Sequence, residues 1–383
     1  MLAAVIIIIF FIPYTASGFA ACGKLFSSLF GMNYMTAMII SAVVIVAYTT
    51  AGGFFAASAT DFVQSIIMTV AIVFVLVFST ISAGGVDAVV ENAKALPGYL
   101  SLTASYIEDT GKSEPYNLLH IITTLSWGLG YFGMPHILLR FMAIEDEKKL
   151  RLSRRVASVW VVIAMAMAVL IGRALSNTGL VDQLHGNDTE TIIVRVAHLL
   201  STYGAFPAIM AGLILAGILA STMSTADSQL LAAASSVSEN ILREAFHLKI
   251  SEKKSMLAAR LTVIGIAILG IIIARNPDSS VFGIVSFAWA GFGAAFGPLV
   301  ICSLFWKRTT LPGAIAGMAS GGAMVFIWKY LIKPIGGVFG IYELLPAFLV
   351  GLVLMVIVSL CTKAPSKEIT DEFDRVKAMG KAK

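Results

Sequence analysis

A short glycine-rich stretch, GLGYFG at residues 128–133, has the G-x-G-x-x-G spacing of a loop that binds dinucleotide phosphates. That chemistry needs a preceding strand, a following helix and an acid about 20 residues further on, inside a soluble βαβ unit. Here the preceding residues, YNLLHIITTLS, belong to a long apolar segment of the membrane-spanning kind. The stretch therefore does not indicate a nucleotide site.

The same stretch predicts an interrupted membrane helix. Gly128, Gly130 and Gly133 lower helix stability and Pro135 removes a backbone donor, so we expect the helix to open near mid-membrane. Irregular backbone at that depth persists only where it lines a cavity, as in the discontinuous helices of many secondary transporters. The alternative is a kinked helix whose glycines only permit close packing.

Two aromatic residues favour the first interpretation. Trp127 and Tyr131 lie one helical turn apart on the same face. Their rings cover an apolar solute and still offer a hydrogen-bond donor. We therefore expect them to form part of a cavity wall.

A second group of polar residues lies in the segment LAGILASTMSTADSQLLAAASS. At about 100° per residue, Ser221, Ser224, Thr225 and Ser228 fall within one sector of a helix, whereas Asp227 points away from it. Neutral hydroxyl and carbonyl oxygens suit Na⁺ better than Ca²⁺, which prefers several carboxylates. The alternative is that these small residues only hold membrane helices together.

Asp61, in TTAGGFFAASATDFVQS, is an acid next to an apolar segment. Acids inside a membrane are costly and therefore indicate function. The connection before the third apolar segment is short, however, so Asp61 could instead cap the helix that follows. Both interpretations stay open on the residues alone.

Other chemistries have little support in the sequence. The three cysteines are odd in number and have no C-x-x-C spacing, and no two of the five histidines form an H-E-x-x-H motif. No nucleophile accompanies a base in a recognisable motif, so an enzyme is not predicted. The net charge of +5 is scattered over short loops, which is not typical of nucleic-acid binding.

The composition requires a lipid environment for these groups. Of 383 residues, 58% are hydrophobic and only 13% are charged, about half the charged fraction of soluble domains. Runs of about 20 apolar residues cross a bilayer as helices, because every peptide group must be bonded internally there. We predict an all-α, polytopic membrane protein with about ten spans: 3–30, 34–52, 55–84, 116–142, 156–176, 204–235, 256–274, 281–306, 311–332 and 341–362.

The basic residues predict the orientation of these spans. One side of the membrane receives Lys148, Lys149, Arg151, the pair Lys307 and Arg308, and the lysines of the tail. Fewer basic residues fall on the opposite side. By the positive-inside rule the first side is cytoplasmic, with the C-terminus inside.

Four stretches resemble the sodium:solute symporter family: YTTAGGFFAASATDFVQS, SWGLGYFGMPHILLRFMAI, MSTADSQLLAAASSVSEN and SFAWAGFGAAFGPLVICSLFW. They occur in the family's order, and the resemblance extends from Met1 to about Lys363. It is strongest to the members that carry proline. It implies sodium-coupled uptake of a small organic solute, L-proline above all, by alternating access in a bacterial plasma membrane. The resemblance implies Na⁺ as the only metal and no cofactor. The implied partners are Na⁺, the solute and the lipid bilayer, and no protein partner is evident.

The resemblance also assigns roles to residues. It implies that Ser224, Thr225 and the carbonyl of Ser221 hold Na⁺, although the family usually has alanine at the last position. Asp61 matches an acid linked to sodium use. The solute residues that it implies are Tyr14, Trp127, Tyr131 and Pro135. Met134 stands where proline carriers commonly have glutamine, so another small solute of the family is the alternative.

The family fold consists of two inverted five-helix repeats. On this resemblance, residues 1–84 are the last three helices of the first repeat, 85–115 an extracytoplasmic loop, 116–306 the second repeat, 307–362 additional helices and 363–383 a cytoplasmic tail. Family chains have about three more spans before the position of Met1, with a second broken helix among them. We therefore expect an N-terminally truncated product that lacks the first helices of repeat 1 and cannot couple sodium to uptake.

Two rival functions share the fold. A sensor would need an attached signalling domain, and the tail from Thr362 is too short for one. A sodium-permeable channel is also compatible with a polar stripe and a broken helix. Saturable uptake that requires a sodium gradient distinguishes a carrier from a channel.

Two further local expectations concern helix packing and the outer loops. The spacing of Gly313, Gly317 and Gly321 predicts close helix contact. The outer connections are each expected to contain a short amphipathic helix, at VDAVVENAKAL and TETIIVRVAHLLS.

Overall fold

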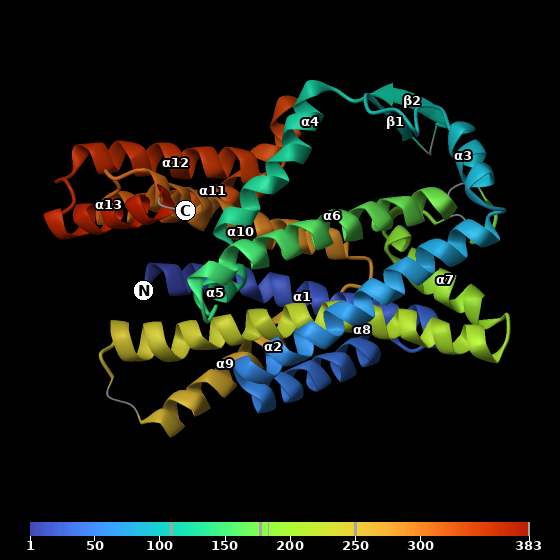
Figure 1. Cartoon of the computed structure of the whole chain (residues 1–383), viewed down its shortest axis with the longest axis horizontal. Coiled ribbons are helices and arrows are strands. Elements are labelled where there is room, and N and C mark those ends of the chain that lie inside the picture. Colours follow the sequence, from blue (N-terminus) through green and yellow to red (C-terminus); the bar gives the residue numbers. More distant parts are fainter. Residues whose placement is uncertain (108–109, 176–177, 183, 249–250, 382–383) are drawn as a thin grey trace.

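The computed structural model of the chain describes residues 1–107, 110–175, 178–182, 184–248 and 251–381. Long helices lie roughly along one axis of the molecule (Figure 1). In the described part of the chain, nine helices are long and apolar enough to cross a membrane. The predicted helical membrane fold is therefore confirmed, although the predicted tail and outer loop include residues 382–383 and 108–109, which lie outside the description.

The first helices form the start of the bundle. α1 (Leu2–Phe30) ends at Gly31, whose φ of 64° is a left-handed conformation that favours glycine. α2 (Tyr34–Ser82) contains two spans, because Gly53 at φ 64° and ψ −171° interrupts the helix. The chain thus turns back there without a long loop.

The connection after α2 contains more structure than the sequence predicts. α3 (Val86–Lys94) confirms the expected amphipathic helix. It is followed by an antiparallel hairpin of β1 (Ala104–Ile107) and β2 (Lys112–Pro115), in which Ala104 pairs with Pro115. This hairpin is a small exception to the all-α prediction. Its strands have only four residues each and no clear alternation of apolar and polar residues, so their pattern is weak.

The predicted span 116–142 is not one continuous helix. α4 (Leu118–Leu125) leads into the 3₁₀ segment η1 (Ser126–Gly133), and α5 (Pro135–Met142) follows. Figure 1 shows α4 descending from the hairpin towards α10 and α5. Nine long helices and this divided segment together account for the ten predicted spans.

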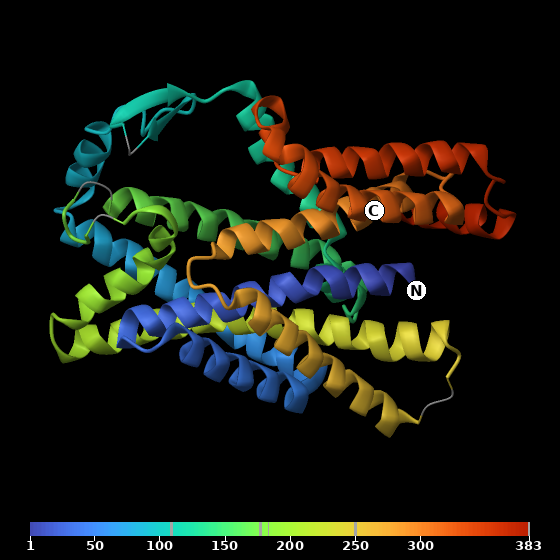
Figure 2. The same ribbon diagram turned by 180° about the vertical axis from the view of Figure 1, so that it is seen from behind.

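The remaining helices of the central bundle follow in order. Their bounds are η2 (Glu147–Lys149), α6 (Leu150–Leu175), η3 (Gly186–Thr191), α7 (Ile192–Ser201), α8 (Ala205–Ser235), the π-helical η4 (Ser236–Ala245), α9 (Glu252–Ala274) and α10 (Val281–Phe305). α7 confirms the second expected amphipathic helix. α2 packs along α8, and α1 contacts α8, α9 and α10 (Figure 2).

The last helices pack beside α10. Their bounds are α11 (Leu311–Ile327), η5 (Trp328–Ile332), η6 (Lys333–Ile335), η7 (Gly337–Gly340), α12 (Leu344–Cys361) and α13 (Lys367–Lys381). A Cβ on Gly313 would lie 2.0 Å from Ser359 Oγ, one on Gly317 2.6 Å from a methyl of α12, and one on Gly321 2.2 Å from the carbonyl of Ala294. The predicted close packing at these glycines is confirmed.

Aromatic rings of α1 and α10 form the centre of the core. Phe11 and Phe292 have ring centroids 4.6 Å apart, and Phe10 and Phe292 5.8 Å apart; all three side chains are almost fully buried. Such pairs stabilise a contact by about 0.5–1.5 kcal/mol beyond their area of burial. α10 is therefore a firmly held wall for the groups on η1.

Candidate functional site

The interrupted segment η1 lies directly against α10. Gly130 and Gly133 are buried at this contact: a Cβ on Gly130 would lie 1.9 Å from Trp289 Nε1, and one on Gly133 2.3 Å from the carbonyl oxygen of Phe292. A Cβ on Gly128 would meet nothing within 4 Å. Two of the three glycines thus permit close approach, which the sequence left as an alternative to opening.

Trp127 belongs to a group of stacked rings at the start of η1. Its ring centroid lies 5.2 Å from that of Trp289, 5.4 Å from Phe282 and 5.7 Å from Tyr342, and all three pairs are nearly parallel. Trp289 Nε1 donates a hydrogen bond of 3.0 Å to the Trp127 carbonyl. Tyr131 meets Trp289 edge-on at 4.7 Å and is half exposed. Trp127 and Tyr131 are therefore brought together by Trp289.

Tyr14 contacts the other end of the interrupted segment. Its buried ring on α1 lies 5.9 Å from that of His136, which follows Pro135 at the start of α5. His136 also contacts Phe11 at 5.8 Å, and its Nδ1 has no hydrogen-bond partner among the described residues. The four implied solute residues thus fall into two groups, joined by the backbone of η1 and the first turn of α5.

The polar stripe of α8 brings three oxygens together on one turn. Ser224 Oγ donates to the Ser221 carbonyl at 3.2 Å, and Thr225 Oγ1 donates to the same carbonyl at 3.0 Å. Ser228 Oγ continues the stripe by donating to the Ser224 carbonyl at 2.9 Å. Since both hydroxyls need only rotate to release the carbonyl, the turn offers three neutral oxygens to a hard cation.

A charged network lies beside this stripe and links α2, α5 and α8. Asp61 on α2 forms an ion pair with Arg140 on α5, and Arg140 Nη2 donates to Ser228 Oγ at 2.7 Å. Ser228 in turn donates at 3.3 Å to Asp227 Oδ1, and the Asp227 side chain is fully buried. One oxygen of each acid, Asp61 Oδ1 and Asp227 Oδ2, has no partner within the described part of the chain.

Arg140 was missed by the sequence analysis. It lies within the predicted span 116–142, and an ionisable residue inside a membrane span is itself a signal of function. The structure also assigns Asp61 a partner on another helix, which the capping alternative does not require. Two acids and one guanidinium connect α2, α5 and α8.

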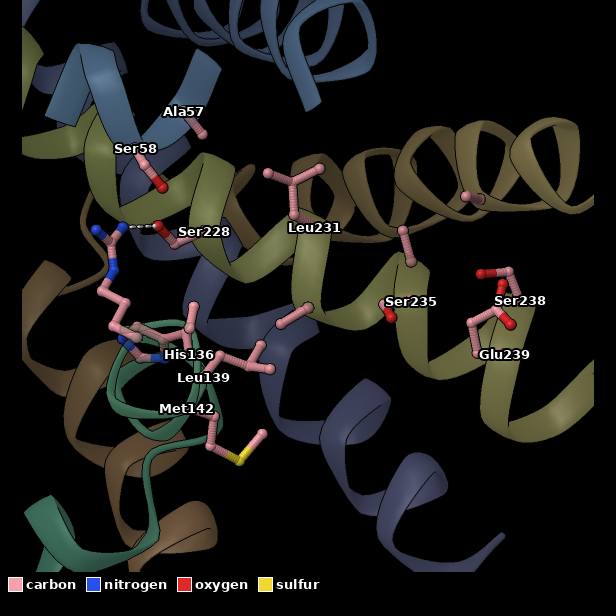
Figure 3. Close-up of a pocket in the computed structure, with 15 residues that line it drawn as sticks. Ala57, Ser58, His136, Leu139, Met142, Ser228, Leu231, Ser235, Ser238 and Glu239 are labelled. Carbon is pink, nitrogen blue, oxygen red and sulfur yellow. Dashed lines mark hydrogen bonds between the residues drawn. The ribbon is translucent and has the colours of Figure 1, made fainter. Parts of the chain in front are cut away.

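A cavity of about 550 Å³ opens beside this network (Figure 3). It lies between α2, α5, α8, η4 and α9, and its polar lining includes Ser58, His136, Arg140, Ser228 and Ser235. Figure 3 shows Ser58 near Ser228, the residue that accepts the Arg140 hydrogen bond, with Ser235 further along α8. The described lining residues include neither the aromatic pair on η1 nor the α1 tyrosine.

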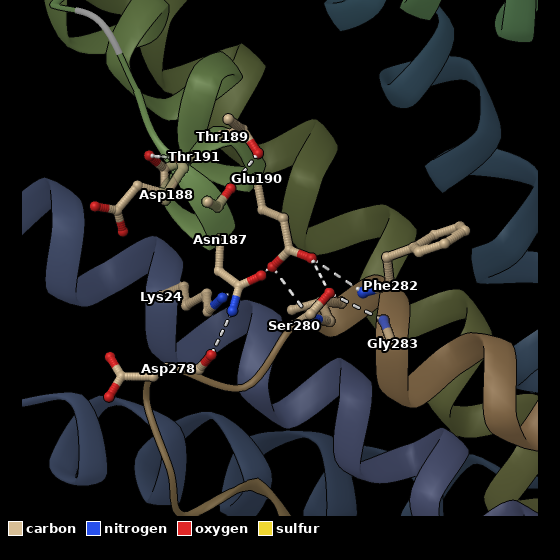
Figure 4. A network of polar contacts seen from close by, with 12 residues as sticks. Lys24, Asn187, Asp188, Thr189, Glu190, Thr191, Asp278, Ser280, Phe282 and Gly283 are labelled. Atoms are coloured by element: carbon tan, nitrogen blue, oxygen red, sulfur yellow. Dashed lines mark hydrogen bonds and ion pairs between the residues drawn. The ribbon is translucent and has the colours of Figure 1, made fainter. Parts of the chain in front are cut away.

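A second polar network links α1, η3 and the N-terminal end of α10 (Figure 4). Glu190 on η3 accepts hydrogen bonds from Lys24 of α1 at 2.8 Å, from Ser280 at 2.9 Å and from the amides of Val281 and Phe282 at 3.1 Å. Burial alone would raise the pKa of Glu190, but these donors outweigh it and lower that pKa below its ordinary value of 4.5. The carboxylate thus stabilises the N-terminus of α10, the helix that supports η1.

These features define a class: a helical membrane protein with a divided helix that contacts, through its α5 part, a helix carrying a polar stripe. Residues 1–321 match the Sodium:solute symporter family, and this chain belongs to that family. The resemblance seen in the sequence is therefore confirmed. A family of transporters also confirms that the chain is a transporter, not an enzyme.

Individual relatives agree with this assignment. Sodium/proline symporter 2 of Staphylococcus saprophyticus is 38% identical over 389 residues, which cover 100% of this chain and 73% of the relative. The high-affinity proline transporter PutP of Bacillus subtilis is 39% identical over 373 residues, covering 97% and 74%. These percentages do not support the predicted truncation at the N-terminus, since they leave open which part of the relatives is unmatched.

A solved structure shows the same fold. A Na⁺-coupled sialic acid symporter, in its substrate-bound outward-open state, superimposes with a TM-score of 0.74. The match covers 96% of this chain and 75% of the other, at 18% sequence identity. At that identity the likeness concerns the fold and carries no information on the solute.

Proposed function

We propose that this chain couples the inward movement of Na⁺ to the uptake of L-proline by alternating access. The observation that carries the proposal is the convergence of the Ser224 and Thr225 hydroxyls on the Ser221 carbonyl of α8, the helix that Arg140 of the interrupted segment contacts at Ser228. Membership in the sodium:solute symporter family supports the coupling, and the names of the two relatives support the solute.

The proposed cation site consists of the Ser221 carbonyl, Ser224 Oγ and Thr225 Oγ1. Neutral oxygens on one helical turn suit a monovalent hard cation, and no cofactor takes part. Asp61 is the proposed sodium-linked acid. This role is supported by its pairing with Arg140, which also donates a hydrogen bond to Ser228 on α8.

The proposed solute site consists of Tyr14, Trp127, Tyr131 and Pro135. Aromatic faces suit the pyrrolidine ring of proline, and the amides of a broken helix suit its carboxylate. Met134 is fully buried, where proline carriers commonly have glutamine. Another small solute of the family is therefore the second candidate.

The proposed organisation follows the family fold. Residues 1–84 contribute helices to the first inverted repeat and 116–306 form the second, with helices 307–362 beside them. The proposed location is the bacterial plasma membrane, with the C-terminus in the cytoplasm. The support is the excess of basic residues in the connections on that side, Lys148, Arg151 and Lys307 among them.

Uptake into proteoliposomes tests the proposal. Labelled proline should accumulate only with an inward sodium gradient, and unlabelled proline should compete better than other small solutes. Replacing Ser224 and Thr225 with alanine should raise the half-saturating sodium concentration roughly tenfold or more, because two hydroxyl ligands to a charge are lost.

Thr262→Ala on α9 is the matched control. Within the described part of the chain, its hydroxyl bonds only to its own helix, at 2.8 Å from the Ala258 carbonyl. Sodium affinity should be unchanged in this variant. Unchanged affinity in the Ser224 and Thr225 variant would overturn the cation site, and indifference to proline would select the second candidate.

A further inference from the structure

A second cavity, of about 1080 Å³, lies between the end of α5, the start of α6 and the last turns of α10. We call it the α5–α10 groove. It is separate from the polar stripe of α8 and from the aromatic rings on η1. Its lining residues have two kinds of chemistry, which fall on different helices.

The walls contributed by α5 and α10 are apolar. Leu138 and Phe141 come from α5, and Leu299 and Leu304 come from α10. Phe141 is 44% exposed and Leu304 60% exposed, although both belong to elements of the bundle core. The surface left open here is the kind that hydrocarbon chains cover.

The wall contributed by η2 and α6 is basic. Lys148, Arg151 and Arg154 line the groove together with one acid, Glu147, so three positive charges and one negative leave +2. Arg151 and Arg154 lie three residues apart and therefore on one face of the helix. Among the described residues, the salt bridges include neither arginine nor Lys148. The planar guanidinium fork binds phosphate oxygens in pairs.

The groove lies where its apolar wall and its basic wall meet the membrane surface. α10 ends at Phe305 and is followed by Trp306, a residue type that concentrates at headgroup level, and then by Lys307. α6 begins at Leu150 on the basic wall. The apolar part thus lies at the depth of the acyl chains and the basic part at the depth of the phosphates.

We propose that the α5–α10 groove binds an anionic phospholipid. The phosphate contacts Arg151 and Arg154, and the acyl chains lie along the apolar residues of α5 and α10. The apolar walls distinguish this occupant from a free phosphate ion. Basic pockets between membrane helices bind anionic headgroups by this combination of charge and hydrocarbon contact.

Native mass spectrometry of the full chain in detergent tests the proposal. The protein is titrated with phosphatidylglycerol and, in parallel, with phosphatidylcholine of the same acyl chains. Phosphatidylglycerol should bind more tightly. The double variant Arg151→Gln, Arg154→Gln should bind phosphatidylglycerol roughly 10- to 30-fold more weakly, because each arginine near an anionic lipid surface contributes several-fold to the affinity and two are lost.

Arg155→Gln is the matched control. Arg155 is exposed, lies on the same helix and carries the same charge, but it does not line the groove. Phosphatidylglycerol binding should be unchanged in this variant. If the double variant fails to fold, the single Arg154→Gln variant should still show a loss of several-fold.

Four results would overturn the proposal. They are equal binding of the two lipids, an equal loss in Arg155→Gln, displacement of the lipid by inorganic phosphate at the same concentration, and a lipid-free dimer that covers the groove. None of these measurements depends on transport. Failure of the lipid site and failure of the proposed function are therefore distinguishable.

Discussion

Gly133 packs the backbone of the divided helix against the backbone of α10. A Cβ at this position would lie 2.3 Å from the Phe292 carbonyl oxygen and 2.9 Å from the Gly297 amide nitrogen. Ordinary van der Waals contact begins at 3.4 Å, so the Cβ of Gly133→Ala would be 3.4 − 2.3 = 1.1 Å too close. Backbone atoms of a buried helix cannot rotate away, so η1 itself must move.

The cost of this movement follows from the packing of the core. Forcing extra atoms into a well-packed site costs about 1–3 kcal/mol. For a chain of this length that cost corresponds to a fall of roughly 1–4 °C in apparent melting temperature. Because Trp127 and Tyr131 lie on the displaced segment, sodium-driven solute uptake should fall as well.

Gly128→Ala provides the comparison within the same segment. A Cβ there meets nothing within 4 Å, and the residue does not require a left-handed φ. Alanine lowers the conformational entropy of the unfolded chain, so stability should be unchanged or increase by up to about 1 kcal/mol. The assay is thermal unfolding of each purified variant in detergent at one heating rate, with uptake measured in parallel. Equal melting temperatures for Gly133→Ala and the wild type would refute the packing argument.

Three further predictions concern charge and packing elsewhere in the molecule. Arg140→Gln should lower the free energy of unfolding by about 1–2 kcal/mol, less than for a fully buried pair because Arg140 is 44% exposed, and it should change the sodium dependence of uptake. Arg140→Lys should restore part of both properties. A wild-type sodium curve in Arg140→Gln would contradict a role beside the cation path. Glu190 has a lowered pKa, so its stabilising contribution is complete above its ordinary pKa of 4.5 and is lost as pH falls through the folded value. The melting temperature of Glu190→Gln should therefore lie below that of the wild type at neutral pH and approach it in acid, and a constant difference across that pH range would count against the linkage. The Cβ of Gly321→Ala would lie 2.2 Å from a carbonyl oxygen of α10, so this variant should destabilise the protein by about 1–3 kcal/mol. Gly265→Ala, whose Cβ meets nothing within 4 Å, should not destabilise it. Similar melting curves for the two variants would argue against close packing at α11.

Much of the architecture could be predicted from the sequence, because lipid allows few solutions. A run of about 20 apolar residues has to satisfy its peptide groups internally, so the length of each run already indicates a helix. The same local logic predicted α3 and α7 in the outer connections and the close contact at Gly317. The family itself was recognisable because its motifs are contiguous in the chain. The assignments of Ser224, Tyr14 and the other site residues stay predictions.

Only the tertiary structure decided which residues meet. Asp61 and Arg140 are 79 residues apart in the sequence. Trp127 stacks on Tyr342, which lies just before α12. Membrane helices are apolar on most of their surface, so periodicity does not show which face of one helix packs against which face of another. The sequence by itself determined the solvent, the number of spans and the family. The charged network, the rings around Trp127 and the α5–α10 groove depend on how helices distant in the chain are brought together, because each consists of side chains from at least two of them.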